Sequence, residues 1–260
     1  MNNAAARTLE ALAAGNRLRD RYEAATVLGT FVIELPTPRT IRALGLAGFE
    51  FVVLDLEHSP FGFDTLPALV AEAQACSLPV LVRVWGHDAG LIGKVLDTGA
   101  NGVMVPRIAR PDQAEAIVAA ARYAPRGERG MSPLISYSAS PRPQATLDNN
   151  TIVVLQIEGR AAVQNSAEIA KVEGVDCIFI GPYDLSQSLG KPGDVHAKEV
   201  LAAAETVAAG IPAGVMLGTY VDDPLKSEEW AEKGFRFQCV SFDGRMLLEG
   251  AQTVFKGATR

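Results

Sequence analysis

The chain is predicted to fold as an α/β protein of the (β/α)₈ class, a TIM barrel in a single domain, and three observations predict this class. Eight short apolar runs alternate with helix-length amphipathic segments along the 260 residues, which is the repeat of such a barrel. The runs are continuously apolar, as expected for parallel strands covered on both faces. A doubly wound open sheet stays an alternative, although no Gly-x-Gly-x-x-Gly follows an early run to indicate a dinucleotide site.

The expected strands are β-branched and apolar, and turn residues separate them from the helices. They cover 27–33, 51–56, 79–84, 102–106, 151–158, 176–181, 212–217 and 236–242. Helices are expected near 38–47, 64–77, 88–99, 111–122, 161–172, 197–209, 224–233 and 244–256. Residues 1–26 are interpreted as a helical extension, rather than a secretory signal, ahead of a barrel domain at 27–260.

One segment departs from this regular spacing. Residues 123–150 are rich in Pro, Ser, Asn and Arg and are longer than an ordinary connection, which favours a functional role. Because the segment lies between the fourth and fifth strands, we expect it to hang over the catalytic face of the barrel.

Composition excludes several classes of partner. The net charge of −6 argues against nucleic acid, because neutralising phosphates requires a basic face. No apolar run reaches the roughly 18–20 residues that cross a bilayer. The three cysteines, Cys76, Cys177 and Cys239, are far apart and are expected to be reduced thiols. These features predict a cytoplasmic protein that acts on small molecules.

Polar and charged residues, and one Gly-Pro pair whose backbone can approach a ligand, collect where consecutive strands end, which is where barrel enzymes place their chemistry. They are Asp55, Glu57 and His58 after the second strand, Arg83 in the third, Gln156 and Glu158 in the fifth, and Gly181, Pro182 and Asp184 after the sixth. One such residue alone would more often be part of a structural ion pair. Several of them on adjacent strands favour a functional site.

Two of these carboxylates are expected to lie side by side. Glu158 and Asp184 end the two strands of a single β–α–β step, and no lysine lies beside them. Such a pair suits a hard divalent cation whose remaining ligands are water and substrate oxygens. Asp184 could instead simply cap the next helix, but capping does not explain Glu158.

The lysines narrow the chemistry further. None of the seven ends a predicted strand, whereas a Schiff-base aldolase or a PLP enzyme on a barrel would need one there. What remains is a metal, an arginine and a set of His and carboxylate groups. That combination suits polarisation of a 2-oxo acid, with the arginine on the developing enolate and a base for proton transfer.

Six motifs resemble those of one known family. They are LDLEHSPFGFDTL, PVLVRVWGHD, LDTGANGVMVPRI, RYAPRGERG, VLQIEGRAAVQN and VEGVDCIFIGPYDLSQSLGKPG. In this order, over about residues 27–250, they are similar to the HpcH/HpaI aldolases, the class II pyruvate aldolases. The resemblance implies a hexamer (a trimer of dimers) whose subunits exchange the C-terminal helix. It also implies Mg²⁺, Mn²⁺ or Co²⁺ as cofactor, and no PLP, NAD or Schiff-base lysine.

The resemblance assigns the metal and substrate contacts residue by residue. Glu158 and Asp184 would hold the metal, and Arg83 would hold pyruvate and steady its enolate. Gln156 would lie near metal-bound water. The backbone of Gly181 and Pro182 would line the pyruvate carboxylate.

The resemblance also implies a base dyad. His58 would carry the proton, and Asp97 of the VLDTG stretch would orient it, as a carboxylate does for other catalytic histidines. Histidine suits this role because it exchanges protons near neutral pH. Asp55 would order Arg83 or the metal-bound water, whereas Glu57 and His87 receive no firm role.

The expected function is the reversible cleavage of a 4-hydroxy-2-oxo acid to an aldehyde and pyruvate or hydroxypyruvate. Three alternatives stay open. The same enolate could serve an oxaloacetate decarboxylase or a carbon–carbon synthase, or a citrate-lyase-like enzyme could act on a CoA ester. A barrel that binds a sugar acid without catalysis is the third.

Overall fold

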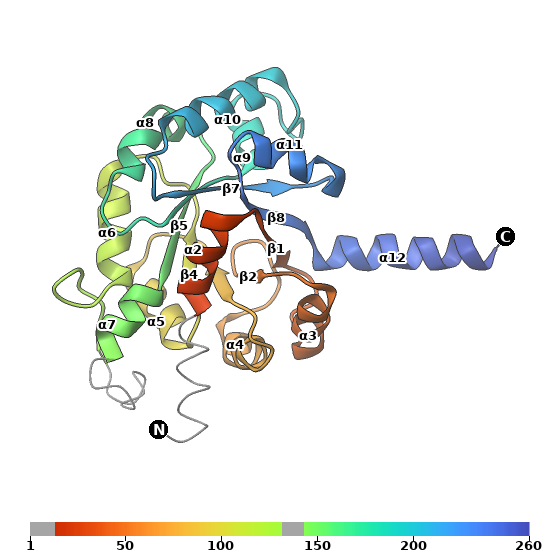
Figure 1. The fold of residues 1–260 in the computed structure, drawn as a ribbon, viewed down its shortest axis with the longest axis horizontal. Coiled ribbons are helices and arrows are strands. Elements are labelled where there is room, and N and C mark those ends of the chain that lie inside the picture. The colour runs from red at the N-terminus through yellow and green to blue at the C-terminus, as the bar shows by residue number, and fades with distance from the viewer. Residues whose placement is uncertain (1–13, 132–142, 260) are drawn as a thin grey trace.

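The computed structural model describes residues 14–131 and 143–259, and the strands within them form a closed parallel barrel in the order β1-β2-β3-β4-β5-β6-β7-β8. The strands are β1 (Val27–Val32), β2 (Phe51–Asp55), β3 (Val80–Arg83), β4 (Gly102–Val105), β5 (Ile152–Ile157), β6 (Cys177–Ile180), β7 (Met216–Val221) and β8 (Phe237–Phe242). Helices surround the barrel (Figure 1). The predicted (β/α)₈ barrel is therefore confirmed, and the open doubly wound sheet is wrong.

The helices follow the strands in the expected alternation. They are α2 (Ala14–Ala24), α3 (Pro38–Ala47), η1 (Phe63–Thr65), α4 (Leu66–Ala75), α5 (Ala89–Asp97), α6 (Pro111–Ala121), α7 (Pro143–Asn150), α8 (Arg160–Ala170), α9 (Pro182–Ser188), α10 (Lys198–Gly210), η2 (Pro224–Lys226), α11 (Ser227–Glu232) and α12 (Asp243–Ala258). Local capping fixes several starts. Thr37 accepts a hydrogen bond from the Thr40 amide at α3, and Asp88 accepts one from Leu91 at α5.

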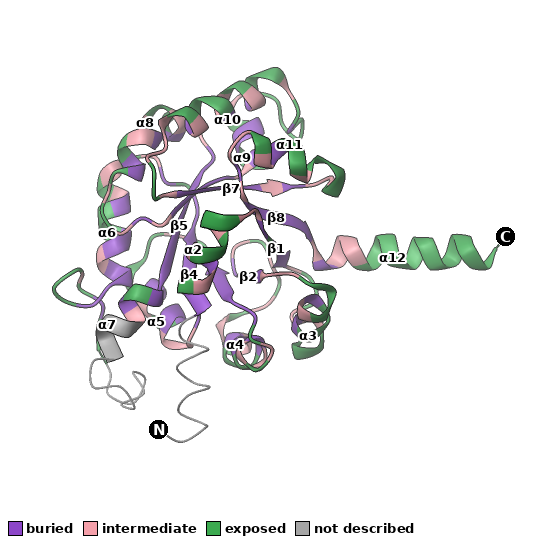
Figure 2. Ribbon diagram, viewed as in Figure 1, coloured by how far each residue is buried: buried purple, intermediate pink, exposed green. Residues whose placement is uncertain are grey.

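The strands are buried on both faces, and this explains their unbroken apolar runs. Every residue of β2 and β5 is buried, whereas the surrounding helices expose their outer faces to solvent (Figure 2). One apolar cluster fills the space between strands and helices, and a second fills the barrel interior. In the interior, Phe51 stacks on Phe237 with ring centroids 4.3 Å apart. A side chain on Gly29 would collide with the Phe51 ring, so glycine is required there.

The seventh strand lies later in the sequence than predicted. The expected run was 212–217, but Pro212 and Val215 form a turn through the Val215 N–H···O=C Pro212 hydrogen bond, and β7 begins at Met216. The apolar run therefore belongs partly to the turn that enters the barrel. As a consequence β7 ends at Val221. Tyr220, rather than residues 217–219, therefore lies at the C-terminal end of this strand.

The described parts of the predicted loop segment 123–150 lie at the opposite end of the barrel from the one predicted. Its described parts are 123–131 and 143–150, because 132–142 lie outside the described residues. The segment follows α6, which returns the chain to the N-terminal ends of the strands. There Tyr123 N–H donates to Asp148, and Arg122 binds Asp176 just before β6. The expectation that this segment covers the catalytic face is wrong for these parts.

The helical extension ahead of β1 covers the N-terminal opening of the barrel. Leu18 of α2 is buried in the interior cluster, and the Tyr22 hydroxyl accepts a hydrogen bond from the Leu217 amide. Arg19 forms an ion pair with Asp176 at 2.8 Å. These contacts close the end of the barrel that lies away from the polar cavity described below.

The last helix, α12, projects from the barrel (Figure 1). Its root is fixed by Asp243, whose buried carboxylate accepts hydrogen bonds from the amides of Ile33, Glu34 and Leu35 after β1. Beyond the root, the apolar side chains Leu247, Leu248, Val254 and Phe255 are exposed. Among the described residues, no helix combines the length and apolarity needed to cross a membrane.

Candidate active site

A cavity of about 280 Å³ opens at the C-terminal ends of the strands. Seven predicted site residues line it: His58, Arg83, Gln156, Glu158, Gly181, Pro182 and Asp184. Two larger hollows, of about 690 and 700 Å³, lie on the outer surface against α6 and carry none of these seven residues. A third, of about 450 Å³, borders Glu158 and Asp184 from the side of Arg107 and carries none of the other five. The cavity at the strand ends is therefore the candidate active site.

Arg83, the last residue of β3, is held rigidly at the bottom of this cavity. Its Nε and Nη2 donate to the two carboxylate oxygens of Asp55 at 2.9 and 2.7 Å. Its Cζ also lies 4.7 Å from the centroid of the Phe31 ring. Burial alone would lower the pKa of Arg83, but Asp55 outweighs burial and raises it. Arg83 is thus a fixed cation with one face toward the cavity.

Glu158 is a buried carboxylate that lacks a neutralising partner of its own. Its side chain lies just after β5, and Oε1 accepts a hydrogen bond of 2.7 Å from the Arg107 amide. Arg107 adopts a left-handed backbone with φ of 60°, a strained conformation that aims this amide at Glu158. Burial, and then the charge of Asp184, raise the pKa of Glu158 to about 7.

Asp184 lies on the first turn of α9, where the helix dipole favours a carboxylate. The neighbouring Gly181 is needed for a steric reason, since a Cβ there would lie 2.5 Å from Oε2 of Glu158. The Oε1 atom of Gln156 is buried and has no hydrogen-bond partner among the described residues. Two carboxylates and a free amide oxygen therefore converge on one side of the cavity.

These groups fit a hard divalent cation. In the described parts of the chain, no group of three or more His, Cys, Asp or Glu residues is arranged so that it could hold a metal ion by itself. Two carboxylates can nevertheless hold Mg²⁺ or Mn²⁺ when water and substrate oxygens complete the coordination. The unpartnered Gln156 oxygen points to a further polar group in the loaded site, because buried oxygens without partners are rare.

The carboxylate nearest to His58 in this chain is Glu57. Oε2 of Glu57 lies 3.7 Å from Nε2 of His58 and 3.6 Å from Nε of Arg83. Oε1 lies 2.9 Å from Nη2 of Arg107. Burial raises the pKa of Glu57, although Arg83, His58 and Arg107 each lower it. Glu57, which the sequence left without a role, links the histidine to two arginines.

Asp97 does not meet His58 within one chain, so a single subunit does not form the expected dyad. Asp97 is the last residue of α5, which runs back toward the N-terminal ends of the strands. Its carboxylate pairs there with Arg129 at 2.7 Å. His58 follows β2 at the other end of the barrel, with its side chain 49% exposed. The family resemblance identified Asp97. Within one chain, however, α5 carries Asp97 to the N-terminal ends of the strands, away from His58.

The rest of the cavity lining consists of residues that the sequence did not indicate. They are Phe31, Ile33, Phe179, Tyr183, Tyr220, Phe242 and Arg245. Tyr220 was missed because β7 was placed too early. Tyr183 lies inside the GPYD motif itself, where its position beside Asp184 was a signal that could have been used.

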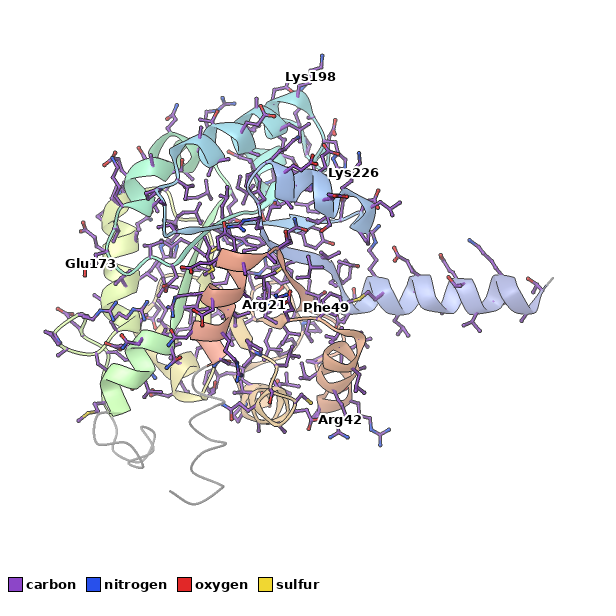
Figure 3. All side chains as sticks on the ribbon, in the orientation of Figure 1. Arg21, Arg42, Phe49, Glu173, Lys198 and Lys226 are labelled. Carbon is purple, nitrogen blue, oxygen red and sulfur yellow. The ribbon has the colours of Figure 1, made fainter. Side chains whose placement is uncertain are left out.

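The remaining histidines and lysines lie outside this cavity. His87 Nε2 lies 2.7 Å from the Pro106 carbonyl oxygen and so joins two loops at the rim. His196 lies 3.7 Å from Asp222. The lysines all lie on helices or loops. Lys198 and Lys226, for example, lie at the outer edge of the molecule in Figure 3.

The closed barrel and the polar cavity at its strand ends define a protein of the (β/α)₈-barrel class. The model of the HpcH/HpaI aldolase/citrate lyase family matches residues 29–250. The chain therefore belongs to this family, and the resemblance found in its motifs is confirmed.

Named relatives agree with this assignment. The chain is 34% identical over 232 residues to a 2-dehydro-3,6-dideoxy-6-sulfogluconate aldolase of Pseudomonas putida, covering 86% of this chain and 89% of that protein. It is 35% identical over 224 residues to a hydroxypyruvate/pyruvate aldolase of Delftia acidovorans, covering 83% and 82%. The crystal structure of an HpcH/HpaI aldolase/citrate lyase family protein from Burkholderia cenocepacia superposes with a TM-score of 0.87 and 30% identity, covering 95% of this chain and 98% of that one.

Proposed function

We propose that the protein is a divalent-metal-dependent aldolase of the class II pyruvate type. It reversibly cleaves a 4-hydroxy-2-oxo acid to an aldehyde and pyruvate or hydroxypyruvate. The observation that carries the proposal is one cavity that combines Glu158, Asp184 and the Gln156 oxygen with the fixed guanidinium of Arg83. Relatives named as hydroxypyruvate/pyruvate aldolase and sulfogluconate aldolase support it.

Glu158 and Asp184 would hold Mg²⁺, Mn²⁺ or Co²⁺. When bound, the ion supplies a Lewis acid that polarises the keto and carboxylate oxygens of the 2-oxo acid. Glu158 must be ionised to act as a ligand. A bound cation would favour the ionised carboxylate and so lower the raised pKa of Glu158. The side-chain amide of Gln156 would form a hydrogen bond with water or substrate beside Glu158 and Asp184.

The chain's own residues account for the proton and charge movements. In cleavage, His58 accepts the proton of the C4 hydroxyl, the C3–C4 bond breaks, and its electron pair becomes the enolate of the 2-oxo acid. Arg83 donates to the enolate oxygen from a position that Asp55 has already fixed, so little reorganisation is needed. A proton returned to C3 then gives pyruvate.

We further propose that the enzyme is a cytoplasmic homo-oligomer, a hexamer built from dimers that exchange α12. Asp97 and His58 lie at opposite ends of one barrel, so Asp97 can serve His58 only if it comes from another copy of the chain. The exposed apolar side chains Leu247, Leu248, Val254 and Phe255 on α12 support association, because contiguous exposed apolar residues mark interfaces.

Exchange of the pyruvate methyl protons in D₂O tests the proposal directly. With Mg²⁺, proton NMR should show loss of the methyl signal, since enolate formation replaces hydrogen by deuterium. EDTA should stop the exchange, and Glu158→Ala should lack it. Glu173→Ala, an exposed carboxylate labelled in Figure 3, is the matched control and should exchange normally. Exchange that persists in EDTA would contradict the proposal.

The alternative reactions use the same enolate and are separated by their substrates. Oxaloacetate releases CO₂ in a decarboxylase, and a citrate-lyase-like enzyme requires a CoA ester. Turnover of both should be compared with cleavage of a 4-hydroxy-2-oxo acid under identical metal conditions. If the protein acts on the CoA ester alone, the proposed aldolase is wrong and the protein is a CoA-ester lyase.

A further inference from the structure

The cavity has two chemically different halves. One half carries the carboxylates Glu158 and Asp184 and the Arg83 guanidinium. The other half is walled by aromatic rings that run outward from Arg83. Phe31 contacts Arg83, and its ring lies 6.2 Å from that of Tyr220. Tyr220 in turn lies 6.0 Å from Tyr183 at the mouth.

The aromatic half must hold the second reactant. In an aldolase the 2-oxo acid occupies the metal and arginine half, and the new carbon–carbon bond forms beside its C3 carbon. The aldehyde therefore approaches from the remaining part of the cavity. Its carbonyl faces C3, and its substituent faces Tyr183, Tyr220 and Phe242.

This wall offers little to a charged substituent. Among the described residues that line this wall, Arg245 is the one basic side chain, and its Nε donates to Glu249 at 2.8 Å. Burial is the main cause that raises the pKa of Tyr183 and Tyr220; Asp222 adds to this effect, and Arg245 opposes it. The Asp222 carboxylate, which lies 3.7 Å from His196, is also near the tyrosines and disfavours a second anion here.

The wall offers equally little to a polyhydroxylated chain. Hydroxyl groups brought out of water need hydrogen-bond partners, or each costs free energy. The ring faces of Phe31 and Phe242 supply none. The Tyr220 hydroxyl is already hydrogen-bonded to Arg245, and burial raises the pKa of Tyr220 to about 12. Flat apolar groups, in contrast, stack well on such rings.

We propose that the aldehyde partner carries an aromatic or similarly flat apolar substituent, and that Tyr183 and Tyr220 determine this specificity. The inference rests on the proposed aldolase function. Tyr183 is 48% exposed and would lose solvent-exposed ring surface when such a substituent binds. Both tyrosines act by contact with the substrate.

The reaction balances without any further reagent. In the synthetic direction pyruvate loses one methyl proton, and the enolate carbon attacks the aldehyde carbonyl carbon. The carbonyl π pair moves to oxygen, which takes up one proton to give the 4-hydroxyl group. Nothing is oxidised or reduced.

The test compares aldehydes with pyruvate and Mg²⁺ on the full-length protein. Benzaldehyde should be used with a higher kcat/KM than glycolaldehyde or succinic semialdehyde. Tyr183→Ala should lower kcat/KM for benzaldehyde about tenfold and for glycolaldehyde less than about twofold. Tyr183→Phe keeps the ring and should retain the benzaldehyde activity. Tyr220→Leu, which keeps an apolar side chain in the half-buried position, should repeat the selective loss.

Three outcomes would overturn the inference. One is a preference for glycolaldehyde or succinic semialdehyde, the second is an equal effect of Tyr183→Ala on all aldehydes, and the third is no aldol product with benzaldehyde. In each case the D₂O exchange of pyruvate protons is measured in parallel. Exchange that continues leaves the aldolase proposal standing while the acceptor inference fails. If the wild-type enzyme shows no exchange, both the aldolase proposal and the acceptor inference are contradicted.

Discussion

Single residues in the cavity carry charges that are only partly balanced. Asp55 neutralises Arg83 through two hydrogen bonds, whereas Glu158 has one backbone donor and a repelling neighbour in Asp184. A buried carboxylate of this kind either keeps a proton or binds a cation. The choice between proton and metal makes the site sensitive to pH.

Metal affinity should therefore fall below neutral pH. The pKa of Glu158 is raised to about 7, so below this pH a bound metal must displace a proton. Calorimetric titration with Mn²⁺ should show affinity falling about tenfold per pH unit below about 7 and levelling above it. Glu158→Gln should bind more than about 100-fold more weakly, with Glu173→Gln unchanged. An affinity that is flat between pH 5.5 and 7.5 would refute this prediction.

Glu57 should matter for turnover, because it lies between His58, the proposed proton carrier, and two arginines. Glu57→Gln keeps the shape but removes the charge that faces His58, Arg83 and Arg107. We expect kcat/KM to fall about tenfold, since such partners orient the groups that react. Steady-state kinetics measure the effect, and Glu72→Gln, in an exposed pair with Arg42, is the control. Equal rates for Glu57→Gln and wild type would assign Glu57 a purely structural role.

At the scale of elements, the junction of β6 and α9 determines how closely the backbone approaches Glu158 in the half of the cavity that carries the two carboxylates. Gly181→Ala should weaken Mn²⁺ binding by more than about tenfold, because the added Cβ would lie 2.5 Å from Oε2 of Glu158 and must displace it. Gly86→Ala is the matched control, since no atom lies within 4 Å of the Cβ there. Calorimetry gives the affinities and circular dichroism checks the fold. Unchanged binding in Gly181→Ala would show that Glu158 is free to move.

The junction of β8 and α12 depends on one carboxylate. Asp243→Asn exchanges one acceptor oxygen for a donor among the Ile33, Glu34 and Leu35 amides. We expect the free energy of unfolding to fall by about 1–3 kcal/mol, because a buried amide loses its acceptor. Urea unfolding measures it. Asp223→Asn, at the exposed start of η2, should change stability much less.

The elements that the sequence predicted well are those with strong local signals. Continuous apolar runs located all strands except β7, whose apolar residues extend into the preceding turn. The carboxylates and Arg83 were found because strand ends share one rim, a rule that needs no side-chain detail. Glu57 and Tyr183 were visible in the motifs, but their contacts depend on side-chain directions that spacing does not define.

The placements that the sequence did not define depend on long-range geometry. Asp97 ends a helix, and no local pattern states which end of the barrel that helix end reaches or which chain it faces. The described parts of 123–150 were placed on the wrong face for the same reason. Tyr220 and Arg245 meet because β7 pairs with β8, which leads directly into α12, and this pairing cannot be read from either segment alone.

At the scale of the whole molecule, complementation can test whether one active site takes His58 and Asp97 from two different chains. His58→Ala and Asp97→Ala should each be nearly inactive alone. Co-expressed chains that form mixed oligomers should regain about a quarter of wild-type activity, because one site in four then receives both intact groups. Native mass spectrometry confirms mixing. Mixed oligomers without recovered activity would show that Asp97 acts within its own chain or not at all.

The hydrogen bonds from Asp243 also bear on how the chain folds during synthesis. They join positions 210 residues apart, at the seam where β1 pairs with β8. The first strand leaves the ribosome early but receives its last neighbour only when the final strand emerges. Throughout that interval one edge of β1 is unpaired, and an unpaired edge can associate with other chains. The nascent protein is therefore most exposed to aggregation before its last residues are translated.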